Sequence, residues 1–278
     1  MKDVGVLVIH GIGSQGKKRP SDTADLKFSG KLFKRVRKEL GSGRTSRIAW
    51  REVFWSDILQ TRQSNYLKAI KRRTRYDFVR RFVLCNLSDA AAYRITPTDD
   101  ADDTYQQIHR RVDETLSDLD RDVKDGAPLI ILAHSMGGHI MSNHIYDRRH
   151  SDPATYPAFQ RFKTMAALVT FGCNIPLFMF SYDPADIIPI DFPGTDLPDR
   201  LKFKTWWQNY YDKDDVLGYP LRDIGPKYEQ MVQTGALKDI PIDSGGLFTS
   251  WNPASHNAYW RDDDLYKPVA KLIAKTLR

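Results

Sequence analysis

The sequence predicts an α/β protein built on a mostly parallel, doubly wound sheet. Short apolar runs, several of them rich in β-branched residues, alternate along the chain with segments of helical periodicity. Strands that alternate with helices favour a parallel sheet covered by helices on both faces. The chain has 278 residues and shows no linker or internal repeat, so we expect one domain over 1–278. The expected strands cover residues 4–9, 48–55, 129–132, 165–171, 202–211 and 236–242.

Three helices are predicted from apolar spacing and end signals. The first is capped by Ser21 or Asp22, runs to Leu40 and is ended by Gly41. The second covers residues 102–123 and the third covers residues 262–277. The second has a continuous apolar stripe, made of Ile108, Val112, Leu116, Leu119 and Val123. Two histidines on predicted helices are expected to be structural or exposed rather than catalytic, namely His109 and His144.

Composition excludes several classes of function. The 42 basic and 35 acidic residues give a net charge of +7, and no nucleic-acid motif is visible, so we expect no nucleic-acid partner. Two cysteines, Cys85 and Cys173, imply no disulfide framework. No apolar run is long enough for a membrane helix, and the run at 4–9 lacks a cleavage site, so a cytoplasmic protein is expected. No pair of His and Cys has zinc spacing, so neither a metal nor a cofactor is expected.

Residues 57–100 form a long insertion between a predicted core strand and the helix over 102–123. The pattern is amphipathic and indicates helices, with basic residues from 62 to 81 interleaved with aromatic ones. One interpretation is a solvated helix face. The other is a helical cap near the site, whose basic segment contacts anionic lipid or an acidic partner.

The stretch from Leu129 to Gly138 is where the sequence points to chemistry. A buried strand runs directly into Ser135, and a helix follows. A serine on such a turn has its hydroxyl at the helix N-terminus, where free N–H groups favour negative charge. The flanking positions must be small, as Ala133 and Gly137 are. The alternative is an ordinary turn with a serine N-cap.

Other polar residues follow predicted strands and are expected at the same edge of the sheet. His10-Gly11-Ile12-Gly13 ends the first strand and is either a tight turn or a phosphate loop, although no phosphate-binding pattern follows. The carboxylates of Asp212, Asp214 and Asp215 follow the strand over 202–211. His256 lies in a late loop. The apolar run 175–180 belongs either to the core or to an apolar substrate pocket.

These motifs together resemble those of the α/β-hydrolases, in particular small bacterial lipases and esterases. "VIHGIG" resembles the oxyanion strand-turn, "AHSMGG" the nucleophile elbow in its Ala-first variant, and "SHNAYW" the loop that delivers the histidine. The resemblance implies an α/β-hydrolase fold with 57–100 as a helical cap insertion. It implies a serine hydrolase that cleaves carboxylic esters of small molecules or lipids through an acyl-enzyme.

In that mechanism Ser135 is the nucleophile, His256 the general base, and a carboxylate orients the histidine. Asp215 is the preferred acid, because Val216-Leu217-Gly218 after it resembles the related pattern, while Asp212 and Asp214 stay open. The N–H groups of Ile12 and Met136 would hold the oxyanion. Two other functions fit the motifs: an acyltransferase with the same triad, and a non-catalytic binding or membrane-associated module of the same fold.

Overall fold

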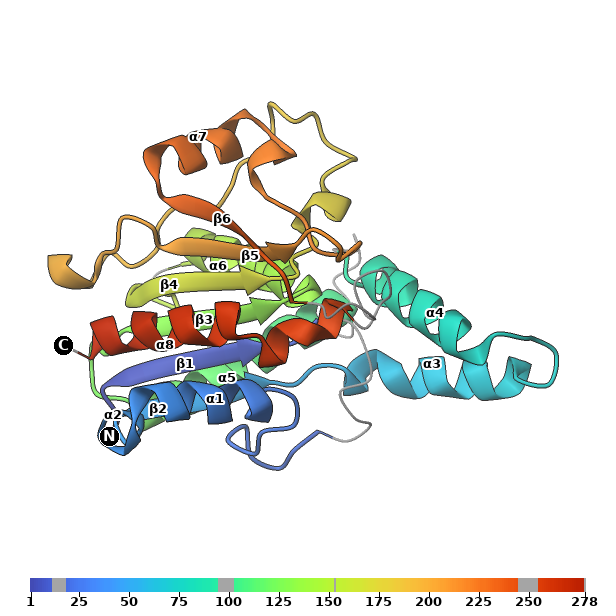
Figure 1. The fold of residues 1–278 in the computed structure, drawn as a ribbon, viewed down its shortest axis with the longest axis horizontal. Coiled ribbons are helices and arrows are strands. Elements are labelled where there is room, and N and C mark those ends of the chain that lie inside the picture. Colours follow the sequence, from blue (N-terminus) through green and yellow to red (C-terminus); the bar gives the residue numbers. More distant parts are fainter. Residues whose placement is uncertain (12–18, 95–102, 153, 245–254, 278) are drawn as a thin grey trace.

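A computed structural model describes residues 1–11, 19–94, 103–152, 154–244 and 255–277. The described residues form a six-stranded sheet in the order β2-β1-β3-β4-β5-β6, and every neighbouring pair is parallel (Figure 1). The strands are β1 (Val4–Ile9), β2 (Ile48–Val53), β3 (Leu129–His134), β4 (Met165–Phe171), β5 (Trp207–Asp212) and β6 (Leu237–Ile242). The predicted α/β class with a parallel sheet is therefore confirmed.

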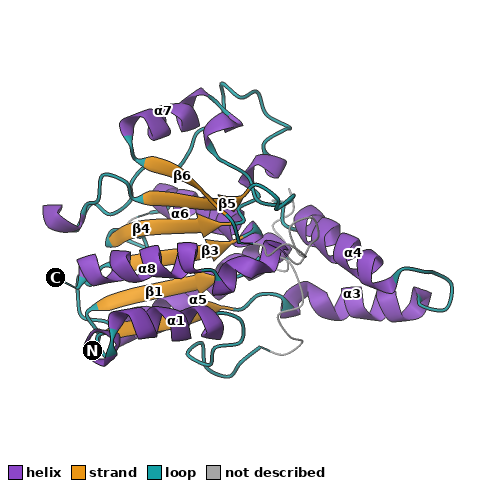
Figure 2. Cartoon of the chain, viewed as in Figure 1, coloured by secondary structure: helices purple, strands orange, loops and turns teal. Residues whose placement is uncertain are grey.

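Helices cover both faces of this sheet (Figure 2). On one face α1 packs against α8, and on the other α5 and α6 contact the first strands. No helix among the described residues combines the length and the apolar character needed to cross a membrane. The helices are α1 (Gly30–Leu40), α2 (Ser42–Thr45), α3 (Asp57–Ile70), α4 (Asp77–Ala92), α5 (Thr104–Asp122), α6 (Met136–His150), α7 (Pro226–Thr234) and α8 (Asp263–Thr276).

The apolar core lies in two layers, one on each side of the sheet. Successive strand side chains point to opposite faces, so in β3 Ile130 and Leu132 join the layer under α1 and α8. Leu129 and Ile131 join the layer under α5 and α6. The predicted stripe of α5 is buried in this second layer throughout. Each fully buried aliphatic side chain contributes roughly 1.5–3 kcal/mol, so the β3 run anchors the centre of the fold.

The first helix begins later than the sequence predicts. It starts at Gly30 rather than at Ser21 or Asp22, because the buried carboxylate of Glu52 on β2 accepts hydrogen bonds from three consecutive backbone N–H groups. These N–H groups belong to Lys27, Phe28 and Ser29, at distances from 2.5 to 3.3 Å. This long-range carboxylate thus caps the amides of residues 27–29, and the helix begins after them at Gly30.

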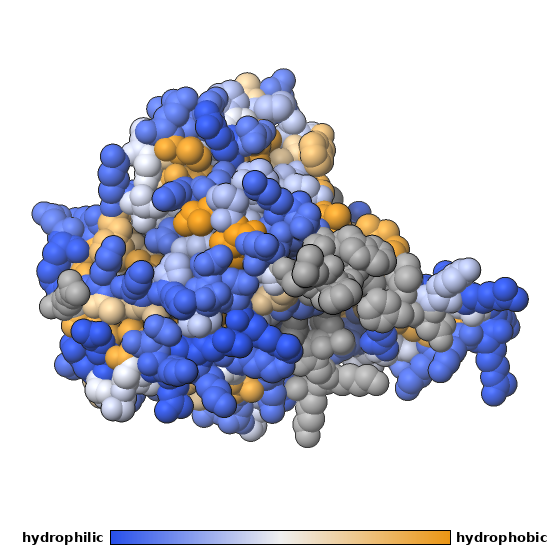
Figure 3. Space-filling view, in the orientation of Figure 1, coloured by the Kyte–Doolittle hydropathy of each residue, from blue (hydrophilic) through white to orange (hydrophobic). Residues whose placement is uncertain are grey.

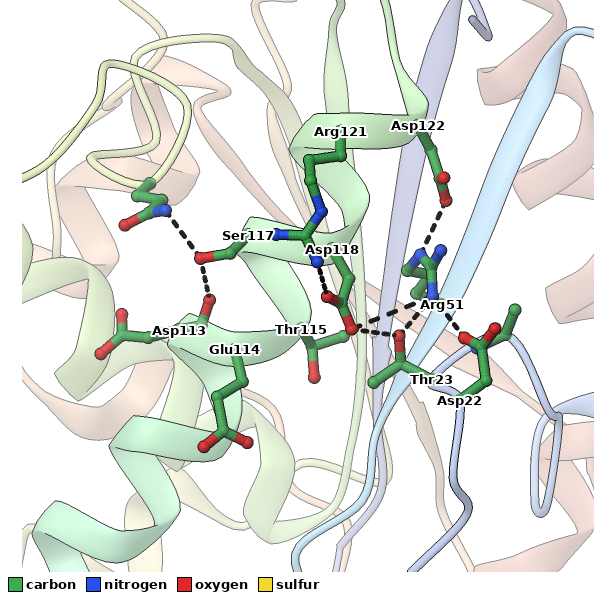
Figure 4. A network of polar contacts seen from close by, with 12 residues as sticks. Asp22, Thr23, Arg51, Asp113, Glu114, Thr115, Ser117, Asp118, Arg121 and Asp122 are labelled. Atoms are coloured by element: carbon green, nitrogen blue, oxygen red, sulfur yellow. Dashed lines mark hydrogen bonds and ion pairs between the residues drawn. The ribbon is translucent and has the colours of Figure 1, made fainter.

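The segment before α1 is held to α5 by a polar network centred on Arg51 of β2 (Figure 4). The Arg51 guanidinium donates to Asp22 at 2.7 Å and to Asp122 at 2.7 Å. The Thr23 hydroxyl donates to Asp118 at 2.9 Å. These contacts fix residues 22 and 23 against α5, so Asp22, one of the two predicted cap residues, is part of a tertiary anchor instead.

Two strands also differ in extent from the prediction, for reasons of hydrogen bonding. The strand expected over 48–55 ends at Val53, because the Trp55 N–H turns to the ring nitrogen of His10. The strand expected over 202–211 begins at Trp207, where pairing with both β4 and β6 starts. The loop expected to carry His256 is a short 3₁₀ helix, Ser255–Arg261.

The insertion over 57–100 contains the two helices α3 and α4, with residues 95–102 outside the described part of the chain. They form a hairpin that follows β2 at the carboxyl edge of the sheet and projects away from the body of the protein (Figure 1). The helical character that the sequence predicts is present. In the described residues the hairpin extends outward rather than across the sheet edge.

The strand order places a topological switch point between β1 and β3. From β1 the chain moves to β2 on one side, and it later returns to β3 on the other side of β1. In open parallel sheets, ligands bind beyond the carboxyl ends of the strands at such a point. Gly11 follows β1 and Ser135 follows β3, so both lie at this position.

Candidate active site

Ser135 occupies a strained turn between β3 and α6. Its backbone has φ 54° and ψ −128°, a region that residues with a β-carbon rarely adopt. Such a conformation costs on the order of 1–3 kcal/mol and persists only where the surroundings impose it. Here the Ser135 N–H donates to the carbonyl of Phe171 at 3.0 Å, and the Ser135 carbonyl accepts from the Gly138 N–H at 2.9 Å. The neighbouring strand and the helix therefore hold the turn in place.

Three glycines leave the space that this turn needs. A β-carbon at position 11 would lie 2.3 Å from the Ser135 β-carbon, and one at position 137 would lie 2.9 Å from the His10 carbonyl oxygen. A β-carbon at Gly138 would lie 2.7 Å from the sulfur of Cys173. A small residue was expected at 137, and Gly11 was expected in a tight turn or a phosphate loop. The structure adds that Gly11 borders the serine itself.

His256 is hydrogen-bonded to the carboxylate of Asp215. The Nδ1 atom of His256 lies 2.8 Å from Oδ2 of Asp215, and both side chains are buried. Tyr259 donates its hydroxyl to the same Oδ2 at 2.9 Å, and the Leu217 N–H donates to Oδ1 at 3.0 Å. Burial opposes ionisation of Asp215, but these donors, with His256 first among them, hold its pKa below the ordinary value. Asp215 is thus an ionised acceptor, and Nδ1 carries the shared proton.

The two other candidate carboxylates lie elsewhere. Asp212 is buried and accepts from the backbone N–H and the hydroxyl of Ser244, each at 2.8 Å. It also accepts from the N–H of Asp214, whose own side chain is exposed. Asp212 therefore organises the loop after β5. Of the three aspartates that the sequence left open, the structure brings Asp215 to His256.

The turn before Ser135 is joined to the loop of His256. The Nε2 atom of His134 lies 2.7 Å from the His256 carbonyl oxygen, and the two imidazole rings are 4.7 Å apart. A β-carbon on Gly172, the residue after β4, would lie 3.2 Å from Cε1 of His256. The Nε2 atom of His256 is buried and has no hydrogen-bond partner in the described residues. The residue before Ser135 therefore contacts His256 directly, and there is no hydrogen bond between Ser135 and His256 in this structure.

Of the two predicted oxyanion donors, the structure describes Met136 but not Ile12. Met136 is the first residue of α6, so its N–H belongs to the helix N-terminus, where amides lack intrahelical partners. Its side chain is fully buried. The other predicted donor, the N–H of Ile12, lies outside the described residues. The positive end of the α6 dipole next to Ser135 favours negative charge there.

The turn after β1 is fixed by Trp55, a contact that the sequence analysis missed. The His10 ring stacks on the Trp55 indole at 5.0 Å, and the indole N–H donates to the His10 carbonyl at 3.0 Å. The His10 Nδ1–H donates to the Gly11 carbonyl at 2.6 Å, which leaves Nε2 to accept from the Trp55 N–H. Burial lowers the pKa of His10 to about 4, so the ring is neutral. The tryptophan at the end of the second predicted strand was the available signal.

The two histidines expected to be non-catalytic lie between α5 and α6. His109 is buried, with Nε2 2.8 Å from the Tyr93 hydroxyl, and its ring lies 4.8 Å from that of His144. Burial lowers the pKa of His144 to about 4, despite Asp113 at 3.2 Å. These contacts join helices rather than line the serine turn, as a structural role requires.

Among the described residues, one acidic group has ligand atoms close enough for a metal ion, at the start of α8. It consists of Asp262, Asp263 and Asp264. The Asp262 carboxylate caps the Asp264 N–H at 2.8 Å, and Asp263 pairs with Lys267 at 2.5 Å. Carboxylates at a helix N-terminus stabilise the helix without a metal, and this explains the cluster.

The sequence matches no protein-family model, and a comparison with curated proteins gives no significant match.

Proposed function

We propose that this protein is a serine hydrolase of the α/β-hydrolase type that cleaves carboxylic esters. The observation that carries the proposal is the buried His256–Asp215 pair at the same edge of the sheet as Ser135, which a strained turn holds at the switch point. Ser135, Asp215 and His256 would form the catalytic triad, in that chain order. The α3–α4 hairpin is the insertion that the proposal treats as the cap.

The proton transfer follows from the tautomer of His256. Because Nδ1 donates to Asp215, the neutral ring has its lone pair on Nε2, which is free to accept a proton. As the Ser135 oxygen attacks the ester carbonyl carbon, Nε2 takes the hydroxyl proton. It then gives this proton to the departing alkoxide, leaving an acyl-enzyme and an alcohol. Asp215 stabilises the imidazolium ion that exists between these steps.

The second half of the reaction uses the same groups. Nε2 takes a proton from water, the hydroxide oxygen attacks the acyl carbon, and the Ser135 oxygen leaves with the proton returned by His256. The Met136 N–H would stabilise the oxyanion in both steps, together with that of Ile12. One such donor typically lowers the barrier by about 3–4 kcal/mol. Acyl transfer differs only in that an alcohol replaces water.

An apolar acyl or alkyl group is the substrate feature that the structure favours. A cavity of about 420 Å³ lies beyond the carboxyl ends of β4 and β5, lined among others by Met179, Phe180 and Tyr219. The Tyr219 N–H donates to the Cys173 carbonyl, and Cys173 packs against Gly138 in the first turn of α6. Within the run 175–180, Ile175 is in the core, and Pro176, Met179 and Phe180 line this cavity, which the proposal assigns to the apolar part of the substrate.

The test is hydrolysis of p-nitrophenyl esters of increasing acyl length by the wild type and Ser135→Ala. The proposal expects turnover by the wild type and loss of turnover in a folded Ser135→Ala variant. Addition of a primary alcohol separates the two reaction types, because a transferase forms the new ester in preference to the acid. No turnover of any ester by the wild type would contradict the proposal and favour a binding module.

A further inference from the structure

The net charge of the protein is concentrated in one short segment. Residues 62–81 contain eight basic side chains and one acidic side chain. Setting this segment aside leaves 34 of the 42 basic residues and 34 of the 35 acidic residues, so the rest of the chain is neutral. The basic residues are Arg62, Lys68, Lys71, Arg72, Arg73, Arg75, Arg80 and Arg81. The +7 charge of the whole chain is therefore the charge of this segment.

All eight basic side chains are exposed, and none forms an ion pair with the residues that the structure describes. Arg62 lies in the half of α3 nearer the base. The other seven lie at the end of α3, in the turn at 71–76 and at the start of α4, which together form the end of the hairpin that projects farthest from the body (Figure 1). The space-filling view shows hydrophilic side chains gathered at this outer end (Figure 3). An uncompensated positive charge here is available to an anionic partner.

The same hairpin exposes apolar side chains. Tyr76 is 80% exposed and Leu87 is 66% exposed. Tyr76 sits in the turn in a left-handed conformation, with φ 63°, which is unfavourable for a bulky residue. Between α3 and α4 lies a cavity of about 820 Å³, lined by apolar residues such as Ile70 and Val83 together with Arg75 and Arg80. Cationic and apolar surfaces therefore meet on one projecting element.

The base of the hairpin is fixed to the body. Arg111 of α5 donates to Asp57 at the start of α3, at 2.9 Å. Tyr93, which follows α4, binds His109 of α5. The hairpin follows β2 at the carboxyl edge of the sheet, the edge that carries Ser135. A surface bound by its outer end would thus lie on the side of the protein where the candidate site opens.

We propose that the α3–α4 hairpin binds the surface of a membrane that contains anionic phospholipid, through its outer end and the side of α4 that exposes Leu87. The basic side chains would contact phosphate head groups, while Tyr76 and Leu87 would enter the boundary of the acyl chains. Charge complementarity points to an anionic partner. Beside its tyrosines the hairpin exposes the aliphatic side chains of Val83 and Leu87. Aliphatic side chains offer no aromatic face on which bases stack, so their presence favours lipid over nucleic acid. This proposal does not depend on the proposed hydrolase activity, because binding is measured without turnover.

The test is co-sedimentation with phosphatidylcholine vesicles, with and without phosphatidylglycerol. Strong binding is expected only with phosphatidylglycerol at about 0.1 M salt, and weak binding at about 1 M salt, where screening is severe. In the variant Arg72→Gln/Arg73→Gln/Arg75→Gln, each lost charge costs roughly a factor of five, so partitioning falls by about 100-fold. Circular dichroism checks the fold of each variant.

A matched control removes three charges from another exposed helix. Lys31→Gln/Lys34→Gln/Lys38→Gln in α1 leaves the same net charge and is expected to bind within about threefold of the wild type. A second variant, Tyr76→Ser/Leu87→Ser, keeps the charge and is expected to lose at least tenfold in binding. Equal losses in the two triple variants would overturn the proposal, as would tighter binding of a single-stranded DNA oligonucleotide than of the vesicles.

Discussion

The Nδ1 atom of His256 lies 2.8 Å from Oδ2 of Asp215, and Tyr259 donates to the same oxygen. This arrangement fixes both the tautomer and the orientation of the imidazole. Asp215 is also the one of the three neighbouring aspartates that binds His256. Asp212 accepts hydrogen bonds from Ser244 instead, and the side chain of Asp214 is exposed.

Asp215→Asn is expected to lower kcat for ester hydrolysis by roughly 10³–10⁴-fold, because an amide no longer fixes the reactive tautomer of His256. The measurement is steady-state kinetics on a short-chain ester after the fold has been checked. Asp214→Asn is the matched control and should retain kcat close to wild type, since its side chain is exposed. A large loss in Asp214→Asn with little loss in Asp215→Asn would reverse the assignment.

Tyr259→Phe is expected to affect stability more than activity. The Tyr259 hydroxyl accepts from the buried Asp212 N–H at 2.8 Å as well as donating to Asp215. Its removal leaves that N–H unsatisfied, at a cost of about 1–3 kcal/mol in the free energy of unfolding. The His256–Asp215 contact remains, so kcat should fall less than about tenfold. Urea unfolding and ester kinetics test this together, and a loss of kcat as large as in Asp215→Asn would argue against it.

Gly11→Ala is expected to disable the site by displacing the serine turn. The new β-carbon would lie 2.3 Å from the Ser135 β-carbon, and a shift of roughly 1 Å at a reacting group costs about 100-fold in rate. The strain should also lower the free energy of unfolding by about 1–3 kcal/mol. Gly43→Ala is the control, because a β-carbon there meets no atom within 4 Å. Wild-type kcat/KM in Gly11→Ala would show that the turn does not require glycine.

The stability of the hairpin is expected to depend on pH through Asp89 of α4. Burial raises the pKa of Asp89 to about 7, although the hydrogen bond from Gln63 opposes the shift. The folded state therefore binds the proton more tightly than the unfolded state, and this contribution to stability is lost as pH rises from about 4 through about 7.

Asp89→Asn should remove that dependence and should be more stable than wild type above pH 7, by on the order of 3 kcal/mol. Urea unfolding between about pH 5 and pH 8 measures the difference between the two proteins. Asp214→Asn again serves as the exposed control. A difference between wild type and Asp89→Asn that stays constant across this range would show that Asp89 does not titrate there.

Local patterns were sufficient to predict the α/β class, because the buried strands and the stripe of α5 are continuous in the sequence. They also pointed to Ser135, to His256 and to the three aspartates after the fifth predicted strand, and the structure brings Asp215 of these to His256. The late start of α1 could not be predicted, because the capping carboxylate of Glu52 lies more than twenty residues away. The stacking of Trp55 on His10 depends in the same way on the pairing of two strands.

The direction in which the α3–α4 hairpin projects could likewise not be predicted from the sequence. The sequence pattern predicted an amphipathic, largely helical insertion near the site, but it could not show that the helices extend away from the sheet edge. That direction depends on contacts at the base, such as Arg111 with Asp57 and Gln63 with Ser88. The basic residues of this segment indicate an exposed helix face, and the structure shows that this face lies on the projecting hairpin (Figure 1).

The central claim is that Ser135 is a nucleophile activated by His256, and covalent labelling tests it most directly. The folded protein is incubated with a fluorophosphonate probe, and the modified peptide is identified by mass spectrometry. The account predicts one label, on Ser135, which is absent from Ser135→Ala and from heat-denatured protein and much slower to form in Asp215→Asn. A protein that stays unlabelled, or a label on another residue that persists in Ser135→Ala, would contradict it.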